Sequence, residues 1–306
     1  MNTDKNLKGH MAALLANLMW GLMAPFGKIV LTDPQFSAFS LTTFRVVGAA
    51  VCFWIFSLFI HREKVGRRDL LRLFFASVFG IVFNQGLSIF GLSYTSPIHM
   101  SIINTMPPIF TMIIAALFLR EPITGKKLAG VITGAVGALI LVLSGSMSSM
   151  DTGSVLGDVL ILMAGISFSL YLTLFKDLMV KYSPITISKW MFTFAVFMLV
   201  PMSWGDVTSI VWSEVPVNIY FNIAFVVFGG TFIAYIAVQT AQKLLRPTVV
   251  SMYNYVQPIV ASVIAVALGM DTFGIPKVIA VVLVFLGVWT VTQSKSRSEL
   301  QPKSKK

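Results

Sequence analysis

The chain has 306 residues, of which 56% are hydrophobic and only 11% are charged. A water-soluble protein carries roughly a quarter charged residues, so this composition excludes a soluble globular protein and indicates an integral membrane protein. The net charge of +11 does not indicate nucleic-acid binding. The lysines and arginines fall in short loops and tails, and no soluble stretch combines a basic face with interleaved aromatic residues.

The hydrophobic segments predict an all-α membrane protein with ten spanning helices. A helix needs about 20 mostly apolar residues to cross the bilayer core, where unpaired backbone groups are costly. The first segment follows a short basic start, as a signal peptide does, but it is too long and lacks a clear cleavage site, so we expect a helix. The predicted spans are residues 10–31, 36–60, 71–93, 97–119, 127–144, 155–177, 184–204, 217–242, 248–268 and 274–293.

The chain repeats itself at a spacing of 150 residues. Between residues 97–137 and 247–287, ten of 41 positions are identical without a gap. We therefore expect two five-helix repeats, residues 10–144 and 155–293, followed by a basic tail at 294–306. The matched positions pair Pro97, Ser101, Asn104, Pro108, Glu121, Lys127 and Gly137 with Pro247, Ser251, Asn254, Pro258, Asp271, Lys277 and Gly287.

The distribution of basic residues predicts the orientation. The two tails and the loops after the second, fourth, sixth and eighth helices hold 19 of the 23 lysines and arginines, whereas the opposite loops hold only Lys277. Basic loops stay in the cytoplasm, so both termini should be cytoplasmic. Because each repeat has an odd number of helices, the second repeat should be inverted relative to the first. Such a duplication is typical of transporters whose central site opens alternately to either side.

The first helix of each repeat carries a face of small, polar and aromatic residues. Asn17 and Trp20 lie on this face in the first repeat, and Phe168 lies on the equivalent face of the second, 148 residues further on. We expect Trp20 and Phe168 to line opposite flanks of a central space. Alternatively, the glycines on these faces serve only close packing, and Lys28 and Lys176 extend to opposite interfaces.

The fourth helix of each repeat carries an asparagine and a proline four residues apart. This spacing puts Asn104 and Pro108, and likewise Asn254 and Pro258, on one helix face. Each proline removes a backbone hydrogen bond, so we expect kinks near mid-membrane that expose backbone carbonyls to a transport site and act as hinges. Alternatively, the two asparagines hydrogen-bond across a helix interface.

Further polar residues lie within the predicted spans. Asn84 in the third helix and Tyr235 in the eighth are expected to face the central space. Arg45, in the second helix, needs an acceptor. It either ties helices together through backbone carbonyls or binds an anionic group of a substrate, and its counterpart Ala195 shows that any such site is asymmetric. His99, at the start of the fourth helix, is either a titratable site residue or a solvated helix end.

Carboxylates are missing from the predicted membrane interior. All 12 acidic residues lie in tails, loops or helix ends, so proton antiport through a buried carboxylate is not indicated. The positive and aromatic interior favours a small organic solute with a carboxylate, such as an amino acid. We expect no metal and no cofactor. An intramembrane enzyme would need a motif such as HExxH or GxSxG, which the chain lacks, and a receptor or scaffold would need larger soluble parts.

Several motifs together resemble the EamA-type drug/metabolite transporters. They are Trp20-Gly21 with Pro25 and Lys28, Phe44-Arg45, Pro107-Pro108, and the stretch from Phe118 to Thr124 continuing to Gly130 and Gly137. Asp271 replaces the usual glutamate, and the sixth helix lacks a Trp-Gly pair. The resemblance implies a multi-pass inner-membrane protein that exports or exchanges amino acids or related metabolites by alternating access.

The predicted substrate site follows from these residues. Trp20, Phe168 and Tyr235 would supply aromatic contact, Asn84, Asn104 and Asn254 hydrogen bonds, and Arg45 a charge anchor, with gating at Pro108 and Pro258. The expected partners are a small-molecule substrate and the lipid bilayer, and the protein is expected to be a monomer or homodimer. The stripe of Gly130, Gly134 and Gly137 favours close helix packing within the chain over a dimer contact.

Overall fold

The computed structural model describes residues 3–92, 94–95, 100, 102–144, 155–267 and 274–294, and every regular element in these ranges is a helix. Eight helices in this part of the chain are long and apolar enough to cross a membrane. Phe197, Phe221 and Trp289 expose 73%, 73% and 61% of their surface, as expected where lipid covers the outer faces. The all-helical membrane fold predicted from the sequence is therefore confirmed.

The eight long helices include two that are assembled from three consecutive segments each. They are α1 (Thr3–Val30), α2 (Ala38–Phe56), the segment α3 (Arg67–Ser77), η1 (Val78–Phe83) and α4 (Asn84–Leu92), α7 (Gly125–Ser144), α8 (Val155–Leu174), α10 (Pro184–Met202), the segment α12 (Val217–Val227), η3 (Phe228–Ile233) and α13 (Ala234–Leu244), and α16 (Ile275–Thr292).

The two three-part segments contain a π-helical turn at matching places. η1 and η3 begin at Val78 and Phe228, which are 150 residues apart, the spacing of the sequence repeat. A π-helical turn accommodates an extra residue and is frequent at functional sites. Residues after it, such as Asn84 and Tyr235, therefore project from a different face than an uninterrupted α-helix would give them.

The predicted spans 97–119 and 248–268 are broken rather than kinked. In the first, a turn at Asn104 and Thr105 precedes α6 (Pro107–Phe118). In the second, α14 (Pro247–Met252) is followed by the 3-10 turn η4 (Tyr253–Tyr255) and by α15 (Val256–Ala267). Pro108 lies in the first turn of α6, where a missing N–H leaves no helical bond unmade. The expectation of a proline kink inside one continuous helix is thus corrected for Pro108, and Pro258 likewise lies in the first turn of α15.

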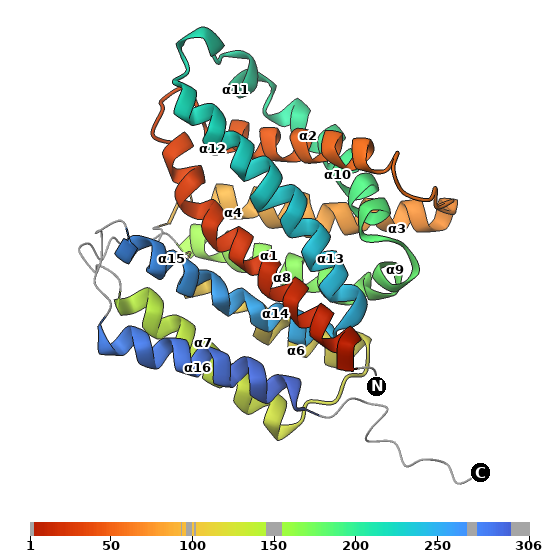
Figure 1. Cartoon of the computed structure of the whole chain (residues 1–306), viewed down its shortest axis with the longest axis vertical. Helices are drawn as coiled ribbons and strands as arrows, with labels where there is room; N and C mark the ends of the chain where they lie inside the picture. Colours follow the sequence, from red (N-terminus) through yellow and green to blue (C-terminus); the bar gives the residue numbers. More distant parts are fainter. Residues whose placement is uncertain are drawn as a thin grey trace.

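The first helix of each sequence repeat packs mainly against helices of the other repeat. α1 lies against α12, α13 and α15, whereas α8 lies against η1, α4 and α6. Figure 1 shows α1 running between α13 and α15. We call α1, α12, η3, α13, α14, η4 and α15 the α1 group, and α3, η1, α4, α6, α8 and the short helix α9 (Lys176–Lys181) the α8 group. Each group therefore combines elements of both repeats.

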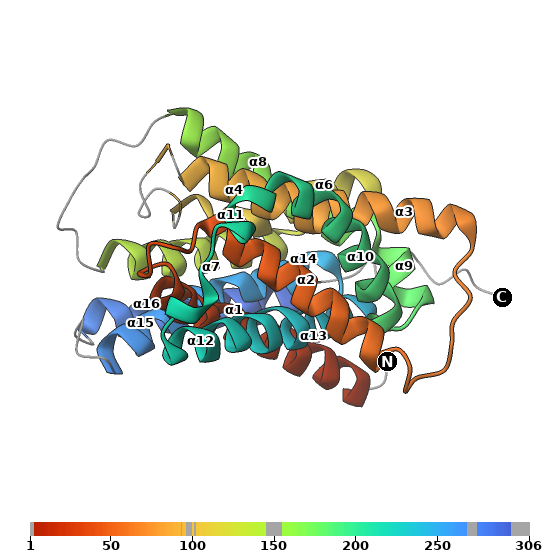
Figure 2. The ribbon, with the colours of Figure 1, turned by 90° about the horizontal axis from the view of Figure 1, so that it is seen from above.

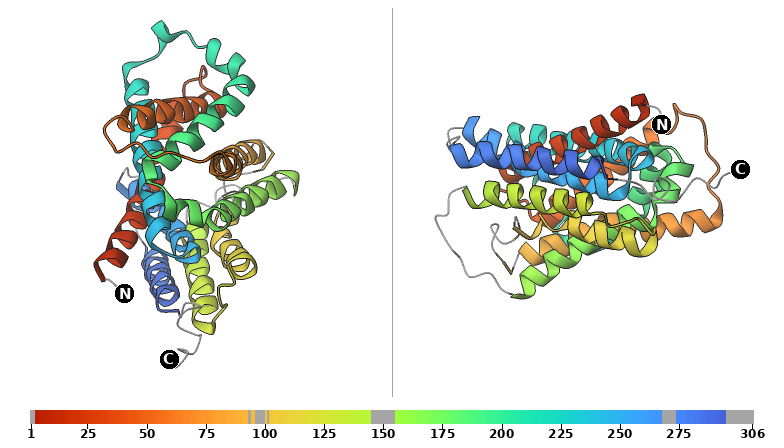
Figure 3. Two further views of the ribbon diagram at one scale, coloured as in Figure 1. Left: turned by 90° about the vertical axis from the view of Figure 1, so that its right-hand side faces the viewer. Right: turned by 90° about the horizontal axis from the view of Figure 1, so that it is seen from below.

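Two further helix pairs join equivalent helices of the two repeats. α2 packs against α10, and α7 packs against α16. α7 and α16 run side by side in Figure 3. The α7–α16 contact is made by backbones: a Cβ added to Gly137 would lie 2.7 Å from the Ala280 carbonyl oxygen, and one on Gly287 would lie 2.6 Å from the Gly134 nitrogen. The glycine stripe of α7 is therefore occupied within the chain, so it is not a free dimer contact.

One end of the bundle carries the start of α1, α9 and the start of α3 (Figure 2). We call it the N-terminal end. Ion pairs of 2.6 Å join Lys181 to Asp69 and Arg72 to Asp177 there. Arg72 and Asp177 expose 41% and 61% of their side chains, so water screens this pair and it contributes little stability. Two short elements, α11 (Trp204–Thr208) and η2 (Trp212–Glu214), connect α10 to α12.

Candidate transport site

The structure brings together the three aromatic residues predicted for the site. The ring of Trp20, on α1, meets the ring of Phe168, on α8, edge to face at 6.1 Å and that of Tyr235, on α13, at 6.0 Å between centroids. Edge-to-face contacts of this kind are favourable for aromatic rings. We call Trp20, Phe168 and Tyr235 the aromatic layer. It lies where the α1 group meets the α8 group.

Tyr235 is fixed in this layer by the π-helical segment of the first repeat. Its hydroxyl donates a hydrogen bond to the carbonyl oxygen of Gly80, in η1, over 3.3 Å. The ring of Tyr171 covers the same glycine, and a Cβ added to Gly80 would lie 2.7 Å from the Tyr171 ring. Glycine is therefore required at position 80, because a side chain there would displace Tyr171.

Arg45 finds its acceptor on the other π-helical segment. Its Nε donates to the hydroxyl of Thr231, in η3, over 3.1 Å, and that hydroxyl donates to the carbonyl oxygen of Val226 over 2.8 Å. Among the residues that the structure describes, no carboxylate forms an ion pair with Arg45. The guanidinium thus ties α2 to η3 through a threonine, and its charge is not neutralised by the described part of the protein.

Asn84 is used to join two helices. Its Nδ2 donates to the carbonyl oxygen of Ala164 over 3.1 Å, which connects α4 to α8. A comparable bond joins α1 to α15, where the Gln257 amide donates to Asn17 Oδ1 over 2.8 Å. These two bonds hold together the α8 group and the α1 group, respectively.

Asn104 and Asn254 lie at the two helix breaks. Asn104 is exposed in the turn before α6, and Asn254 is half-buried in η4. In the ranges that the structure describes, neither side chain takes part in a hydrogen bond that could link the helices, so the interpretation that they pair across an interface is not what the structure shows. Two sequence candidates, His99 and Ser101, lie outside the described residues.

The two lysines at the ends of the first helices differ. Lys28 is exposed at the end of α1. Lys176 instead turns inward, and its Nζ donates to the carbonyl oxygen of Leu245 over 2.8 Å. The alternative that both lysines extend to opposite interfaces is therefore wrong for Lys176, and it stays a prediction for Lys28. Nearby, Lys127 is fully buried and forms a 2.8 Å ion pair with Glu121.

A polar cluster lies beyond the aromatic layer, and two of its members, Tyr171 and Gln242, were not predicted from the sequence. Tyr171 on α8 and Gln242 on α13 are fully buried at the N-terminal end of the bundle, together with Gln239. The spacing of Tyr235, Gln239 and Gln242 was the signal that could have revealed it, because residues four and three apart share one face of a helix.

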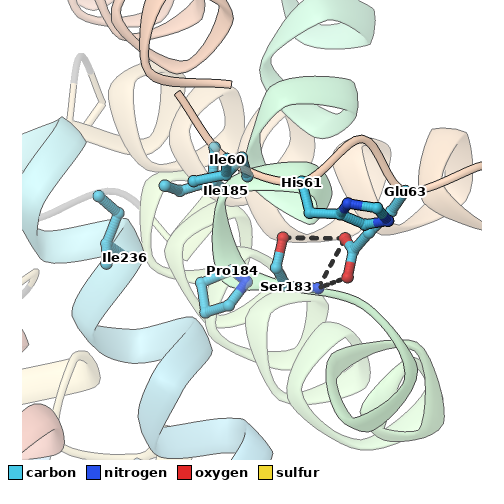
Figure 4. A pocket seen from close by; sticks show the side chains of 7 residues that line it. All are labelled: Ile60, His61, Glu63, Ser183, Pro184, Ile185 and Ile236. Atoms are coloured by element: carbon cyan, nitrogen blue, oxygen red, sulfur yellow. Dashed lines mark hydrogen bonds between the residues drawn. The ribbon is translucent and has the colours of Figure 1, made fainter. Parts of the chain in front are cut away.

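A cavity of about 310 Å³ lies elsewhere, at the N-terminal end (Figure 4). At its rim Glu63 accepts hydrogen bonds from the backbone nitrogen of Ser183 at 3.0 Å and from its hydroxyl at 2.9 Å. Ser183 is the N-cap of α10, so Glu63 reinforces that cap. The cavity is lined by Ile60, His61, Glu63, Ser183, Pro184, Ile185 and Ile236.

This cavity is separate from the aromatic layer. Ile236 follows Tyr235 directly, and successive residues of an α-helix point to different faces. Burial alone would raise the pKa of the Glu63 carboxyl, but the hydrogen bonds from Thr186 and Ser183 outweigh it and hold that pKa below its ordinary value. Within the described ranges, no three His, Cys, Asp or Glu side chains lie close enough to hold a metal ion.

Comparison with known proteins identifies the family. The model of the EamA-like transporter family matches residues 7–143 and again residues 155–293. The uncharacterized transporter YyaM of Bacillus subtilis is 26% identical over 272 residues, which cover 88% of this chain and 89% of that protein. An uncharacterized transporter of Archaeoglobus fulgidus is 24% identical and covers 94% of this chain and 100% of its own length.

More distant similarity extends to plants and to a solved structure. A WAT1-related protein of Arabidopsis thaliana is 24% identical, covering 86% of this chain and 82% of its own. A crystal structure superimposes with a TM-score of 0.78 at 14% identity, covering 95% of this chain and 97% of that one, which supports the fold alone. With two family matches that together span nearly the whole chain, this membrane protein belongs to the EamA-like transporter family.

Proposed function

We propose that this protein is a secondary transporter that exports or exchanges small organic metabolites, amino acids or related carboxylate-bearing solutes, across the cytoplasmic membrane by alternating access. The observation that carries the proposal is the aromatic layer. Trp20 contacts Phe168 and Tyr235 at the place where the α1 group meets the α8 group. A solute held there lies between two groups of helices that can move relative to each other.

The proposed topology has ten crossings in two inverted repeats, residues 10–144 and 155–293, and a basic tail at 294–306. Eight long helices supply eight crossings, and the broken segments of α6 and of α14 to α15 would supply the other two. The matched positions of η1 and η3 support the repeat. The exchanged packing of α1 and α8 supports a pseudo-two-fold axis.

The solute class rests on charge. Arg45 lies one helical turn from the level of Tyr235, because its partner Thr231 precedes Tyr235 by four residues. Since no carboxylate of the described residues neutralises Arg45, an anionic group of the solute is a suitable partner. The amides of Asn104 and Asn254, which form no hydrogen bonds within the described protein, would add polar contacts from the two helix breaks.

Transport is tested with purified protein in liposomes and a panel of labelled amino acids, with and without a pH gradient. We expect accumulation of at least one solute, and Trp20→Ala should reduce it strongly because the aromatic layer loses its central ring. Trp289→Ala is the matched control, since Trp289 exposes 61% of its surface on α16. Equal loss in both variants would remove Trp20 from the site, and no transport by the unmodified protein would favour a receptor or scaffold.

Topology is tested by labelling. The basic loops place both termini in the cytoplasm in this proposal, as for an inner-membrane protein, and an inverted repeat places residue 149 outside. Tags at residue 149 and at the C terminus should therefore report from opposite compartments. Labelling of both tags from the same side would contradict the inverted repeat. A monomer or a homodimer can follow this scheme, because the central site lies within one chain.

A further inference from the structure

Three buried polar side chains near the aromatic layer are only weakly paired with one another. Tyr171, Gln239 and Gln242 each have 0% of their surface exposed. The Tyr171 hydroxyl, Gln239 Oε1 and both amide atoms of Gln242 have no partner within 3.5 Å, and the two glutamine side chains approach the Tyr171 hydroxyl only as long, weak hydrogen-bond partners. Buried polar groups are nearly always paired, and leaving them unpaired costs free energy. The cluster therefore has hydrogen-bonding capacity left for a further partner.

The three side chains continue the line of the aromatic layer. On α13, Tyr235, Gln239 and Gln242 follow each other at intervals of four and three residues, which places them on one face. On α8, Tyr171 follows Phe168 by three residues and lies on the same side. The two helices belong to different groups, so the polar residues lie at the interface between the α1 group and the α8 group, one to two turns closer to the N-terminal end.

This interface is closed at the N-terminal end, which the proposed topology places in the cytoplasm. α13 packs there against α9, and α14 packs against α6 and α8. Three hydrogen bonds join a helix of one group to the chain segment that directly follows a helix of the other: Lys176 Nζ to the Leu245 carbonyl at 2.8 Å, Lys243 Nζ to the Tyr182 carbonyl at 3.2 Å, and Thr248 to Glu121 at 3.2 Å.

Side chains at the helix break of the first repeat are exposed, in contrast to the buried polar residues. Asn104 is exposed, and so is the neighbouring Met106 at 36%. The polar residues on the N-terminal side of the aromatic layer are thus fully enclosed, whereas an asparagine at the level of the break is accessible. In the proposed topology, this arrangement corresponds to a conformation that is sealed toward the cytoplasm.

We propose that Tyr171, Gln239 and Gln242 form a hydrogen-bonding station for the solute on the cytoplasmic half of its path. This inference rests on the proposed transport function. The station offers donors and acceptors but no charge, so it suits a zwitterionic or neutral polar solute and holds it without an ion pair. When the cytoplasmic end opens, water or solute adds hydrogen bonds to these weakly paired atoms. These added hydrogen bonds lower the free energy of the open conformation relative to the sealed one.

Accessibility of a cysteine tests the station. Cys52 is the chain's single cysteine, so Cys52→Ser provides a cysteine-free background for Gln242→Cys. Val238→Cys is the matched control, because Val238 lies one turn earlier on α13 and is 1% exposed in the hydrophobic core. A membrane-impermeant cationic methanethiosulfonate is added to inside-out membrane vesicles, which present the cytoplasmic side.

We expect Gln242→Cys to be modified about tenfold faster than Val238→Cys or more, because even a sparsely populated open conformation exposes the station but not the core. Equal, slow modification of both variants would overturn the proposal. The measurement needs no solute. If the protein transports amino acids but Gln242→Cys is not modified, only the station is ruled out. If Gln242→Cys is modified but the protein transports no amino acid, the proposed solute class is ruled out and the path through the station remains.

Thermal melting gives a second test that separates the station from an ordinary structural glutamine. Gln242→Leu removes buried polar atoms that are only weakly paired, so it should raise the melting temperature of the sealed conformation by about 2 °C. Gln257→Leu is the control, because Gln257 donates a 2.8 Å hydrogen bond to Asn17, and this variant should lower the melting temperature. A decrease for Gln242→Leu comparable to that for Gln257→Leu would overturn the proposal.

Discussion

The hydroxyl of Tyr235 donates a hydrogen bond to the backbone carbonyl of Gly80 over 3.3 Å. This bond joins the helix that follows one π-helical turn to the other π-helical turn, 155 residues away in the sequence. A π-helical turn departs from the regular i to i−4 bonding, and here its backbone accepts a bond from a side chain of the aromatic layer. The two equivalent irregularities of the repeats thus meet at the candidate site.

Tyr235→Phe should test this bond. The variant keeps the ring contacts with Trp20 and with Phe192, whose centroid lies 4.8 Å away, but it loses the hydroxyl. We expect a loss of about 1 kcal/mol in the free energy of unfolding and slower transport in liposomes. Unchanged stability and unchanged transport would show that the bond does not position the ring.

Thr231→Val should lower the free energy of unfolding, because Arg45 loses its hydrogen-bond acceptor. Valine preserves the shape of threonine, but the Nε of Arg45 then lacks the hydroxyl that it contacts at 3.1 Å. We expect a destabilisation of about 1–3 kcal/mol, measured by unfolding in mixed micelles. In the control Thr240→Val, the lost hydroxyl bonds only to Ile236 of the same helix, so the change should stay within about 0.5 kcal/mol.

Gly137→Ala should separate α7 from α16. The new methyl group would lie 2.7 Å from the Ala280 carbonyl oxygen, a contact with backbone that cannot move aside cheaply. We expect a destabilisation of about 1–3 kcal/mol without a change of oligomeric state in size-exclusion chromatography with light scattering. Gly125→Ala is the control, since nothing lies within 4 Å of its added methyl group. A shift from dimer to monomer in Gly137→Ala alone would contradict intrachain packing.

The pH dependence of stability should reveal the Glu63 contact. Because the pKa of Glu63 in the folded protein lies below its ordinary value of 4.5, its bonds to Ser183 stabilise the protein above that value. This stabilisation is lost as the pH falls through the lowered pKa. The melting temperature of the unmodified protein should therefore exceed that of Glu63→Gln at about pH 7, with the difference shrinking toward about pH 3. A constant difference across this range would contradict the assignment.

Much of the architecture could be predicted from the sequence. The apolar segments predicted the long helices, and the faces of the first helices predicted that Trp20 and Phe168 lie at one central site. The sequence predicted Trp20 and Phe168 on opposite flanks of a central space, whereas in the structure their rings are in direct contact. The predicted features depend on local composition and on helical periodicity, which a single sequence displays.

The remaining features depend on contacts between distant segments. The π-helical turns of η1 and η3 leave the apolar pattern unchanged, so periodicity does not reveal them. The prolines marked an interruption, but whether Pro108 would kink a helix or begin one is decided by the packing of α6 against α8. The role of Gln242 could not be predicted for a similar reason. A glutamine at the end of a predicted span is expected to be solvated, and only the tertiary structure buries it.

The exchanged packing of α1 and α8 has a consequence for biosynthesis. During translation α1 enters the membrane long before α12, α13 and α15, the helices that will cover it, have been made. Until those helices are made, the amino-terminal repeat is incompletely packed and one face of α1 contacts lipid. α8 then packs against α4 and α6. Two separately expressed halves should consequently be degraded alone and rescue each other when produced together, because neither half contains the neighbours of its own first helix.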